Sequence, residues 1–259
     1  MKIALCLYGK VGFKTGKADR RDVESIEILK ASFEKYQSNL IAPYGVDVYI
    51  HSWSTSLKDN ILDLYKPQNF VIETQKNFEI NHSFERSFLY SRFYSAYSVT
   101  ELIDKNKKYD LIIMSRFDLE WNITDLSLFN PQKFNVAHYC GYGDSIGADD
   151  FLWGKWRSEK KRPFWSASEL HHFHYDVEDY GIFDHWFASS QEDMLTFGKL
   201  YLHLDEIRSK AKKNKHGVMN PHLMILFYLK KTGLFEKINF TSHYLDTPLI
   251  RRSVFNEFS

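Results

Sequence analysis

The sequence predicts an α/β protein built on a Rossmann-like, mainly parallel sheet with helices on both faces. The main observation is an alternation of strand and helix patterns over residues 1–115. Residues 1–8, 46–50 and 109–115 are short, mostly apolar runs, which are typical of buried parallel strands. Between them, residues 19–39 and 83–107 carry apolar side chains three and four positions apart, the spacing of a helix face. Strands that alternate with helices in this way form parallel sheets, because each crossover places a helix on one face.

Weaker patterns complete the expected order. Further elements are expected as a helix at 58–65, strands at 70–72, 134–139 and 183–188, and helices at 191–207 and 220–231. Residues 149–180 show no clear pattern, so the second half of the chain is expected to be irregular. Phe84, Phe88 and Phe93 recur at helical spacing and are expected in the core. No repeat or linker divides residues 1–259, which predicts a single domain.

Composition narrows the classes of function. The 259 residues are 17% aromatic and 26% charged, with a formal net charge of +1. A chain of this kind folds, and it lacks the basic excess of a nucleic-acid-binding protein. Cys6 and Cys140 predict no disulfide framework. No apolar run reaches the roughly 18 residues of a transmembrane segment, and the run at residues 3–7 is too short for a signal peptide. We expect a cytoplasmic protein, or one in the cytosol of an infected host if it is viral.

The candidate functional residues follow the expected strands. Ligands of open parallel sheets bind beyond the carboxyl ends of the strands, in the crevice where the strand order reverses. Four segments are expected to meet there: Tyr8-Gly9-Lys10, His51-Ser52-Trp53, residues 116–120, and Asp184-His185.

Asp118 and Glu120 directly follow the strand expected at residues 109–115. Alternate residues of an extended chain point the same way, so these carboxylates could share a Mn²⁺ or Mg²⁺ ion that substrate phosphates also bind. Arg116 could bind a carboxylate or a phosphate with both arms of its guanidinium group. The alternative is a solvated loop in which Arg116 and Asp118 form an ion pair.

The loop at residues 9–17 holds three glycines and three lysines. This composition suits phosphate contact through backbone N–H groups and ammonium charges. The loop contains neither Gly-x-Gly-x-x-Gly nor Gly-x-x-x-x-Gly-Lys-Ser/Thr, which argues against a dehydrogenase and a P-loop NTPase. The alternative is a surface loop without a ligand.

The second half contains two candidates for a general base. Asp184 lies in an aromatic segment, and Asp150 is next to Asp149. Partial burial can tune the pKa of such a carboxylate for proton transfer. Asp184 could equally cap a turn.

Three further patterns are weaker. His172, His174 and Asp176 would share a face of an extended segment and could bind Zn²⁺. Residues 143–147 match Gly-x-Ser-x-Gly, but no helix pattern follows directly, so a glycine-rich turn is favoured over a nucleophile elbow. The basic residues within 208–215 could touch anionic lipid, although a solvated helix end is favoured.

Four motifs occur in the order found in a family of small glycosyltransferases of bacteria and large DNA viruses, which the chain resembles. The first is Val-Asp-Val-Tyr-Ile-His-x-Trp, at residues 46–53, and the second is Phe-Tyr-Ser in a helix, at residues 93–95. The third is Tyr-Asp, an apolar strand and Arg-x-Asp, at residues 109–118. The fourth is Asp-x-Trp/Phe with a serine-containing strand-to-helix junction, at residues 184–190.

The resemblance implies a GT-A-like fold that transfers a sugar. Residues 1–125 would bind a nucleotide-sugar donor, and the irregular C-terminal portion, residues 126–259, would bind a glycan or oligosaccharide acceptor. Asp118 would hold Mn²⁺ or Mg²⁺, with Glu120 standing where the family more often has a second Asp. Asp184 would be the catalytic base, with Asp150 as the second candidate. The nucleotide-sugar pocket would be lined by Tyr8, Gly9, Lys10, His51, Trp53, Arg92 and Arg116.

Two other functions are open at this point. One is a non-catalytic carbohydrate-binding protein in which Trp153, Trp156, Trp165 and Trp186 stack on sugars. The other is a metal-dependent phosphoesterase that uses Asp118 and Glu120.

Overall fold

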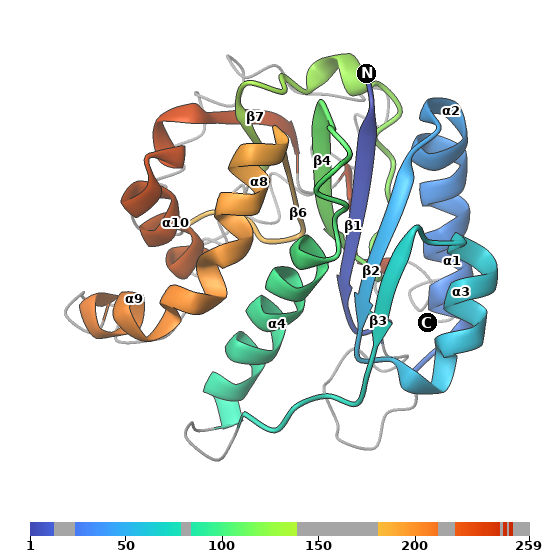
Figure 1. The fold of residues 1–259 in the computed structure, drawn as a ribbon, viewed down its shortest axis with the longest axis horizontal. Helices are drawn as coiled ribbons and strands as arrows, with labels where there is room; N and C mark the ends of the chain where they lie inside the picture. Colours follow the sequence, from blue (N-terminus) through green and yellow to red (C-terminus); the bar gives the residue numbers. More distant parts are fainter. Residues whose placement is uncertain are drawn as a thin grey trace, which may run out of the picture.

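The computed structural model shows a mixed sheet covered by helices on both faces (Figure 1). It describes residues 1–12, 24–78, 84–138, 181–211, 221–243, 246–247 and 249–250. Within these residues the sheet has seven strands in the order β3-β2-β1-β4-β6-β5-β7. The strands are β1 (Ile3–Gly9), β2 (Asp47–Ser52), β3 (Asn69–Ile72), β4 (Leu111–Arg116), β5 (Phe134–His138), β6 (Trp186–Ser189) and β7 (Ile238–His243).

The sheet is mainly parallel, as the alternation of strands and helices predicts. Strand β1 pairs in parallel with β2 and β4, β2 pairs in parallel with β3, and β5 pairs in parallel with β7. Strand β6 is antiparallel to both of its neighbours, β4 and β5. Of the strands described, β6 is therefore the one that runs against the rest.

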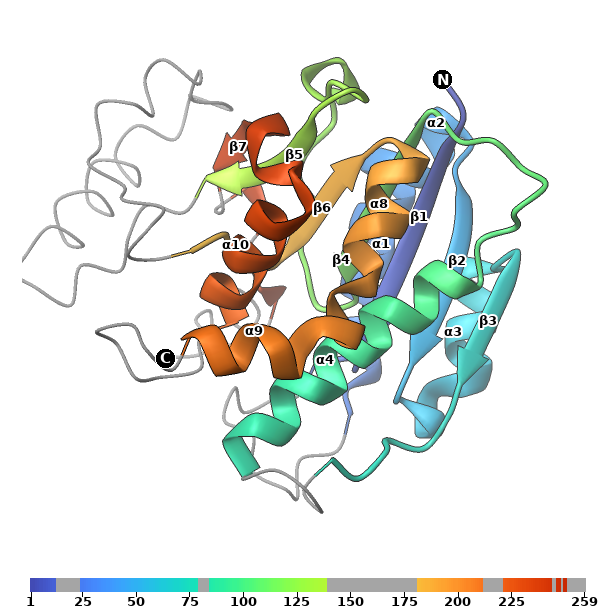
Figure 2. The ribbon, with the colours of Figure 1, turned by 60° about the vertical axis from the view of Figure 1, so that its left-hand side comes forward.

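The helices form a layer on each face of the sheet. Alternate residues of β1 belong to two separate hydrophobic clusters, with Leu5 in one and Cys6 in the other. The first cluster is completed by α1 and α3, and the second by α4, α8 and α10, which come forward in Figure 2. The α-helices are α1 (Ile26–Tyr36), α2 (Ala42–Tyr44), α3 (Lys58–Tyr65), α4 (Phe84–Glu101), α8 (Gln191–Gly198), α9 (Leu204–Ala211) and α10 (Pro221–Thr232). Shorter helical segments are η1 (Gln37–Ile41), η2 (Thr55–Leu57), η4 (Leu126–Leu128), η5 (Lys199–His203) and η6 (Leu234–Lys237).

Several boundaries differ from those expected. Helix α1 begins at Ile26, because the Ser25 side chain accepts the backbone N–H of Ile28 and caps the helix there. Helix α4 ends at Glu101, where the N–H groups of Leu102 and Ile103 bond to carbonyls only three residues back. The helix expected at 191–207 is divided into α8, η5 and α9.

Two other expectations were wrong, and one strand was missed. Strand β6 begins at Trp186, so Asp184 precedes the strand instead of lying inside it. Strand β7 was not expected at all. Phe93 is buried, but Phe88 is 46% exposed although it lies on the same side of α4 as the buried Ser95, two turns nearer the start of the helix. Helical spacing alone therefore did not decide its burial. The side chain of Phe84 lies outside the described residues.

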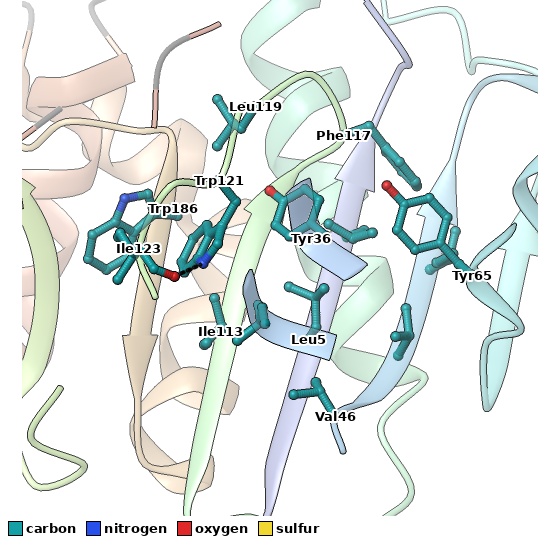
Figure 3. Close-up of a cluster of buried hydrophobic side chains, with 14 of the residues drawn as sticks. Leu5, Tyr36, Val46, Tyr65, Ile113, Phe117, Leu119, Trp121, Ile123 and Trp186 are labelled. Carbon is teal, nitrogen blue, oxygen red and sulfur yellow. Dashed lines mark hydrogen bonds between the residues drawn. The ribbon is translucent and has the colours of Figure 1, made fainter. Parts of the chain in front are cut away.

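The hydrophobic cluster that contains Leu5 joins both halves of the chain. Figure 3 shows Leu5 and Ile113 of the sheet beneath Tyr36 of α1, with Trp121 and Trp186 beside them. The rings of Trp121 and Trp186 meet edge to face with centroids 5.7 Å apart. Because Trp121 belongs to the first 125 residues and Trp186 to the second half, this core depends on both.

Candidate functional site

The candidate site lies at the edge of the sheet where β1, β2 and β4 end. The chain passes from β1 to β2 and β3 on one side, and β4 then pairs on the other side of β1, so the strand order reverses between β1 and β4. Tyr8 is level with His51 on β2 and with Arg116 on β4. Because β6 is antiparallel, its first residue, Trp186, is level with Ser115. This orientation brings Asp184, just before β6, to the same edge.

Arg92 and Asp184 form a buried ion pair that links α4 to the start of β6. Nη1 of Arg92 contacts the Asp184 carboxylate, and Nη2 donates to the Asp184 main-chain oxygen at 2.8 Å. Burial raises the pKa of the Tyr8 phenol, and the nearby charge of Arg92 acts in the opposite direction. Burial raises the pKa of the Asp184 carboxyl, but the charges of Arg92, His222 and Arg116 outweigh burial and hold that pKa well below its usual range. Asp184 is therefore an ionised carboxylate at neutral pH.

Arg116 and Asp118 form a second ion pair a few residues along the edge. Nε of Arg116 donates to Oδ1 of Asp118 at 2.8 Å, and Nη2 donates to Oδ2 at 2.7 Å. This two-point geometry fixes both groups. Asp118 is buried, and a Cβ added to Gly12 would lie 3.1 Å from its Cβ, so the chain that leaves β1 packs directly against it. The ion pair foreseen as the alternative at this position is present, but it lies in a buried site and not in a solvated loop.

Asp118 and Glu120 are held by different partners. The backbone turns at Phe117 and Asp118, so the two carboxylates do not follow one extended segment. Glu120 lies 3.3 Å from the ammonium group of Lys35 on α1. Among the described residues, no group of three or more His, Cys, Asp or Glu side chains is placed to hold a metal ion.

The side chains at the end of β2 are buried. His51 contacts Ser95 of α4 and Glu73 through its two ring nitrogens, at 2.7 and 3.3 Å. Burial lowers the pKa of His51 despite the nearby carboxylate of Glu73. The ring of Trp53 stacks on that of Tyr94 with centroids 5.6 Å apart, and its indole N–H has no partner among the described residues.

Two backbone N–H groups at the start of the first loop already donate hydrogen bonds to serine side chains. The backbone N–H of Gly9 donates to Ser95 at 2.8 Å, and that of Val11 donates to Ser54 at 2.9 Å. These two N–H groups, which suited phosphate contact, are already bonded. Lys10 is partly exposed between them. Ser95 of α4 and Ser54, which follows β2, thus fix the start of this loop.

Two histidines complete the surroundings of Asp184. His185 belongs to a segment that the sequence predicted at this edge, whereas His222 was not singled out from the sequence. His222, in the first turn of α10, lies 3.9 Å from the Asp184 carboxylate and donates Nδ1–H to the carbonyl of Ile182 at 3.0 Å. His185 donates Nδ1–H to the carbonyl of Thr247 at 2.9 Å. Burial, followed by the charge of Arg116, lowers the pKa of His185 to about 3. The sequence gives no indication that His222 lies near Asp184, because the two residues meet only when α10 packs against the segment before β6 in the folded chain.

The structure thus brings together Tyr8, Arg92, Arg116, Asp118 and Asp184, and it places Gly9, Lys10, His51 and Trp53 along the same edge. Glu120 is turned toward α1. Asp150, the histidine-rich segment, the Gly-x-Ser-x-Gly match and the tryptophans at 153, 156 and 165 lie outside the described residues.

The fold and this edge define an α/β protein with a buried, charged site at a reversal of strand order. No family model and no curated protein matches the chain. In the described part of the chain, none of the helices has the length and hydrophobicity needed to span a bilayer.

Proposed function

We propose that this protein is a glycosyltransferase with a GT-A-like fold, which moves a sugar from a nucleotide-sugar donor to a glycan acceptor. The observation that carries the proposal is the convergence of Arg92 from α4, Arg116 from β4 and Asp184 from the segment before β6 on the edge where α/β sheets bind their ligands. Arg116 and Asp184 belong to the ordered motifs of the resembled family, and Arg92 directly precedes its Phe-Tyr-Ser motif; these motifs supply the reaction class.

Two kinds of charge suit this chemistry. Breaking a bond between a sugar and a diphosphate requires positive charge near the leaving group, and guanidinium groups bind phosphate at two points. Arg116 and Arg92 supply that charge in our proposal. Asp184 is ionised and would accept the proton of the attacking hydroxyl, but the arginines that lower its pKa also make it a weaker base than a free carboxylate. Because Arg92 holds this carboxylate in one orientation, it would also position it.

Metal assistance is a separate part of the proposal. Both oxygens of Asp118 accept hydrogen bonds from Arg116, and Glu120 is paired with Lys35, so the described carboxylates do not fit a shared divalent ion in this arrangement. The proposed reaction therefore includes no step that depends on a metal ion. A requirement for Mn²⁺ or Mg²⁺ stays a prediction that a chelator can decide.

The first test is ligand binding by thermal shift with a panel of nucleotide-sugars, with Mn²⁺ and with EDTA. One donor class should stabilise the protein, because stabilisation grows as RT ln(1 + [L]/Kd). The variant Arg116→Lys keeps the charge but loses the two-point geometry, and we expect about tenfold weaker donor binding. Lys58→Met, on the exposed surface of α3, is the control and should bind normally.

The second test is turnover, measured as release of nucleoside diphosphate with a panel of oligosaccharide acceptors. Asp184→Asn should bind the donor as the unaltered protein does but turn over at least about 100-fold more slowly. Normal turnover in that variant would exclude Asp184 as the base. Binding of glycans without any effect of donors would indicate a carbohydrate-binding protein, and hydrolysis of phosphate esters without transfer would indicate a phosphoesterase.

A further inference from the structure

The peptide of Gly9, at the end of β1, is held from three directions. Its N–H donates to Oγ of Ser95 on α4 at 2.8 Å. Its carbonyl accepts from Oγ of Ser52 at 2.9 Å and from the backbone N–H of Trp53 at 3.2 Å. The φ angle of Gly9 is +99°, a conformation that residues with a Cβ rarely adopt. The chain therefore leaves β1 in one defined direction, next to Tyr8 and the buried ion pairs.

Ser95 is connected in turn to His51. Both side chains are fully buried, and Oγ of Ser95 lies 2.7 Å from Nδ1 of His51 and 3.3 Å from the carbonyl of His51. Neither side chain is open to a ligand, since neither is exposed to solvent. Any effect of His51 on a bound ligand must pass through the groups that it contacts.

The hydrogen bonds of His51 fix its tautomer. Nε2 lies 3.3 Å from the carboxylate of Glu73, which only accepts, so Nε2 must carry a proton. In the neutral ring Nδ1 then accepts the Ser95 hydroxyl, and Oγ of Ser95 keeps a lone pair for the N–H of Gly9. Every polar group of the series has a partner in this arrangement. We assign this tautomer from the bonding partners.

The outer end of the series is Glu73, which follows β3 and is partly exposed. Its backbone N–H donates to the carbonyl of Ser52 at 3.0 Å, and its carboxylate lies 3.8 Å from the ammonium group of Lys76. The rings of Trp53 and Tyr94 pack edge-on against His51, with centroids 4.8 and 5.8 Å away. These contacts hold the imidazole in the plane that both hydrogen bonds require.

We propose that Glu73, His51 and Ser95 form a positioning relay that holds the Gly9 peptide at the ligand-binding edge of the sheet. His51 and Ser95 act through Gly9 and do not touch the ligand. The nature of that ligand rests on the proposed function, whereas the relay itself rests on the hydrogen bonds. Loss of the relay lets the start of the first loop move, and displacements of about 1 Å near a site can cost 100-fold in rate or binding.

The relay can be tested without any ligand. In the full-length protein, Ser95→Ala should raise the hydrogen-exchange rate of the Gly9 amide about tenfold, because it removes the acceptor of that N–H. Ser91→Ala is the matched control. Ser91 is buried one turn earlier on α4, and its hydroxyl oxygen accepts a hydrogen bond from Gln75, which is not part of the relay. Nitrogen chemical shifts of His51 should report a protonated Nε2. A protonated Nδ1 with a bare Nε2, or equal exchange rates in the two serine variants, would overturn the relay.

Substitutions of His51 and Glu73 separate positioning from folding. His51→Gln keeps a donor and an acceptor and should restore part of the Gly9 protection that His51→Leu loses. The side chain of Glu73 is partly exposed, so the Glu73→Ala variant should fold even if the variants of the buried His51 do not. We expect it to raise Gly9 exchange about threefold, and no change in exchange would count against the relay.

Activity adds a readout that distinguishes the relay from the function. With a donor identified, Ser95→Ala should raise KM for the nucleotide-sugar about tenfold and change kcat less than about threefold, because Asp184 is held by Arg92 and not by the relay. If no nucleotide-sugar binds or reacts in the unaltered protein, the proposed function is wrong while Gly9 exchange still decides the relay. If turnover is present and Ser95→Ala matches Ser91→Ala in KM, the relay is wrong and the function stands.

Discussion

The charged residues of the candidate site are balanced in pairs. Arg92 is matched by Asp184 and Arg116 by Asp118, and both carboxylates are buried. Burying a charge is costly unless it is paired, so each arginine stabilises the carboxylate next to it. A phosphate ligand would have to share these guanidinium groups with the carboxylates. The two pairs leave the site without a net positive charge, which agrees with the near-neutral composition of the whole chain.

His185 gives the site a dependence of stability on pH. Its pKa in the folded protein is lowered to about 3 by burial and then by Arg116, against an ordinary value of 6.5. Below pH 6.5 the unfolded chain binds a proton that the folded protein does not. The stabilisation is therefore present above that pH and is lost as the pH falls toward 3, at up to about 1.4 kcal/mol per pH unit.

This dependence can be measured by urea unfolding between pH 7 and pH 4. The free energy of unfolding should fall more steeply with acid in the unaltered protein than in His185→Gln, by about 1.4 kcal/mol per pH unit near pH 5. His51 contributes equally to both proteins and cancels in the comparison, and Asp184, which interacts with His185, has an ordinary pKa of 3.8 that lies below the pH range compared. Parallel curves for the two proteins would show that His185 does not titrate in this way.

At the scale of elements, the segment before β6 sets the geometry of the site. Gly181 has a φ of +82°, and a Cβ placed there would lie 2.2 Å from the carbonyl carbon of His222. The N–H of Ile182 donates to the carbonyl of His222 at 3.0 Å. This close approach joins the start of α10 to the segment that carries Asp184. A side chain at position 181 would separate the two.

We therefore predict that Gly181→Ala destabilises the protein much more than Gly45→Ala. Gly45 has a φ of +60° with nothing within 4 Å of its added Cβ, so alanine there meets only the backbone cost of about 1 kcal/mol. At Gly181 the clash with main-chain atoms adds to that cost, and we expect a loss of at least about 3 kcal/mol in the free energy of unfolding. Equal losses in the two variants would mean that α10 shifts freely to accept the methyl group.

The elements differ in how far their sequence determines them. Strands β1, β2 and β4 were predicted within about two residues, because continuous apolar runs between helix patterns have few other arrangements. The direction of β6 could not be predicted, since it depends on which strands it joins in the folded sheet. Strand β7 was missed because its residues, Ile238–His243, alternate apolar and polar side chains weakly and pair in parallel with a distant strand.

The same distinction applies to the site. Arg116 and Asp118 are two residues apart, so their pairing could be foreseen as an alternative. The partners Arg92 and Asp184 were each chosen as candidates, but their contact spans 92 residues and depends on β6 being antiparallel. Ser95 belongs to the Phe-Tyr-Ser motif but was not chosen as a site residue. Glu73 and His222 carried no signal of their own, because a lone glutamate or histidine in a sequence is common.

At the scale of the whole molecule, both cores draw on both halves of the chain. Trp186 of β6 packs against Trp121 and Phe129 on one face of the sheet, with centroid distances of 5.7 and 5.3 Å. On the other face, Phe187 packs against Phe197 of α8 within the cluster that holds Cys6 and Tyr8 of β1. Neither half can bury its apolar surface alone. We therefore expect the protein to unfold as one cooperative unit.

Trp186 offers a direct test of that cooperativity, because two substitutions separate its ring from its N–H. Trp186→Ala leaves a cavity in the shared core and should lower the free energy of unfolding by about 3–5 kcal/mol. Trp186→Phe keeps an aromatic ring and removes an indole N–H that has no partner among the described residues, so it should cost less than about 1.5 kcal/mol. In Trp186→Ala, hydrogen exchange should accelerate to the same extent in β1 and in β5, because the two strands share the loss. If β5 opened while β1 kept its protection, the two halves would be separate folding units, and the candidate site between them would form only when they dock.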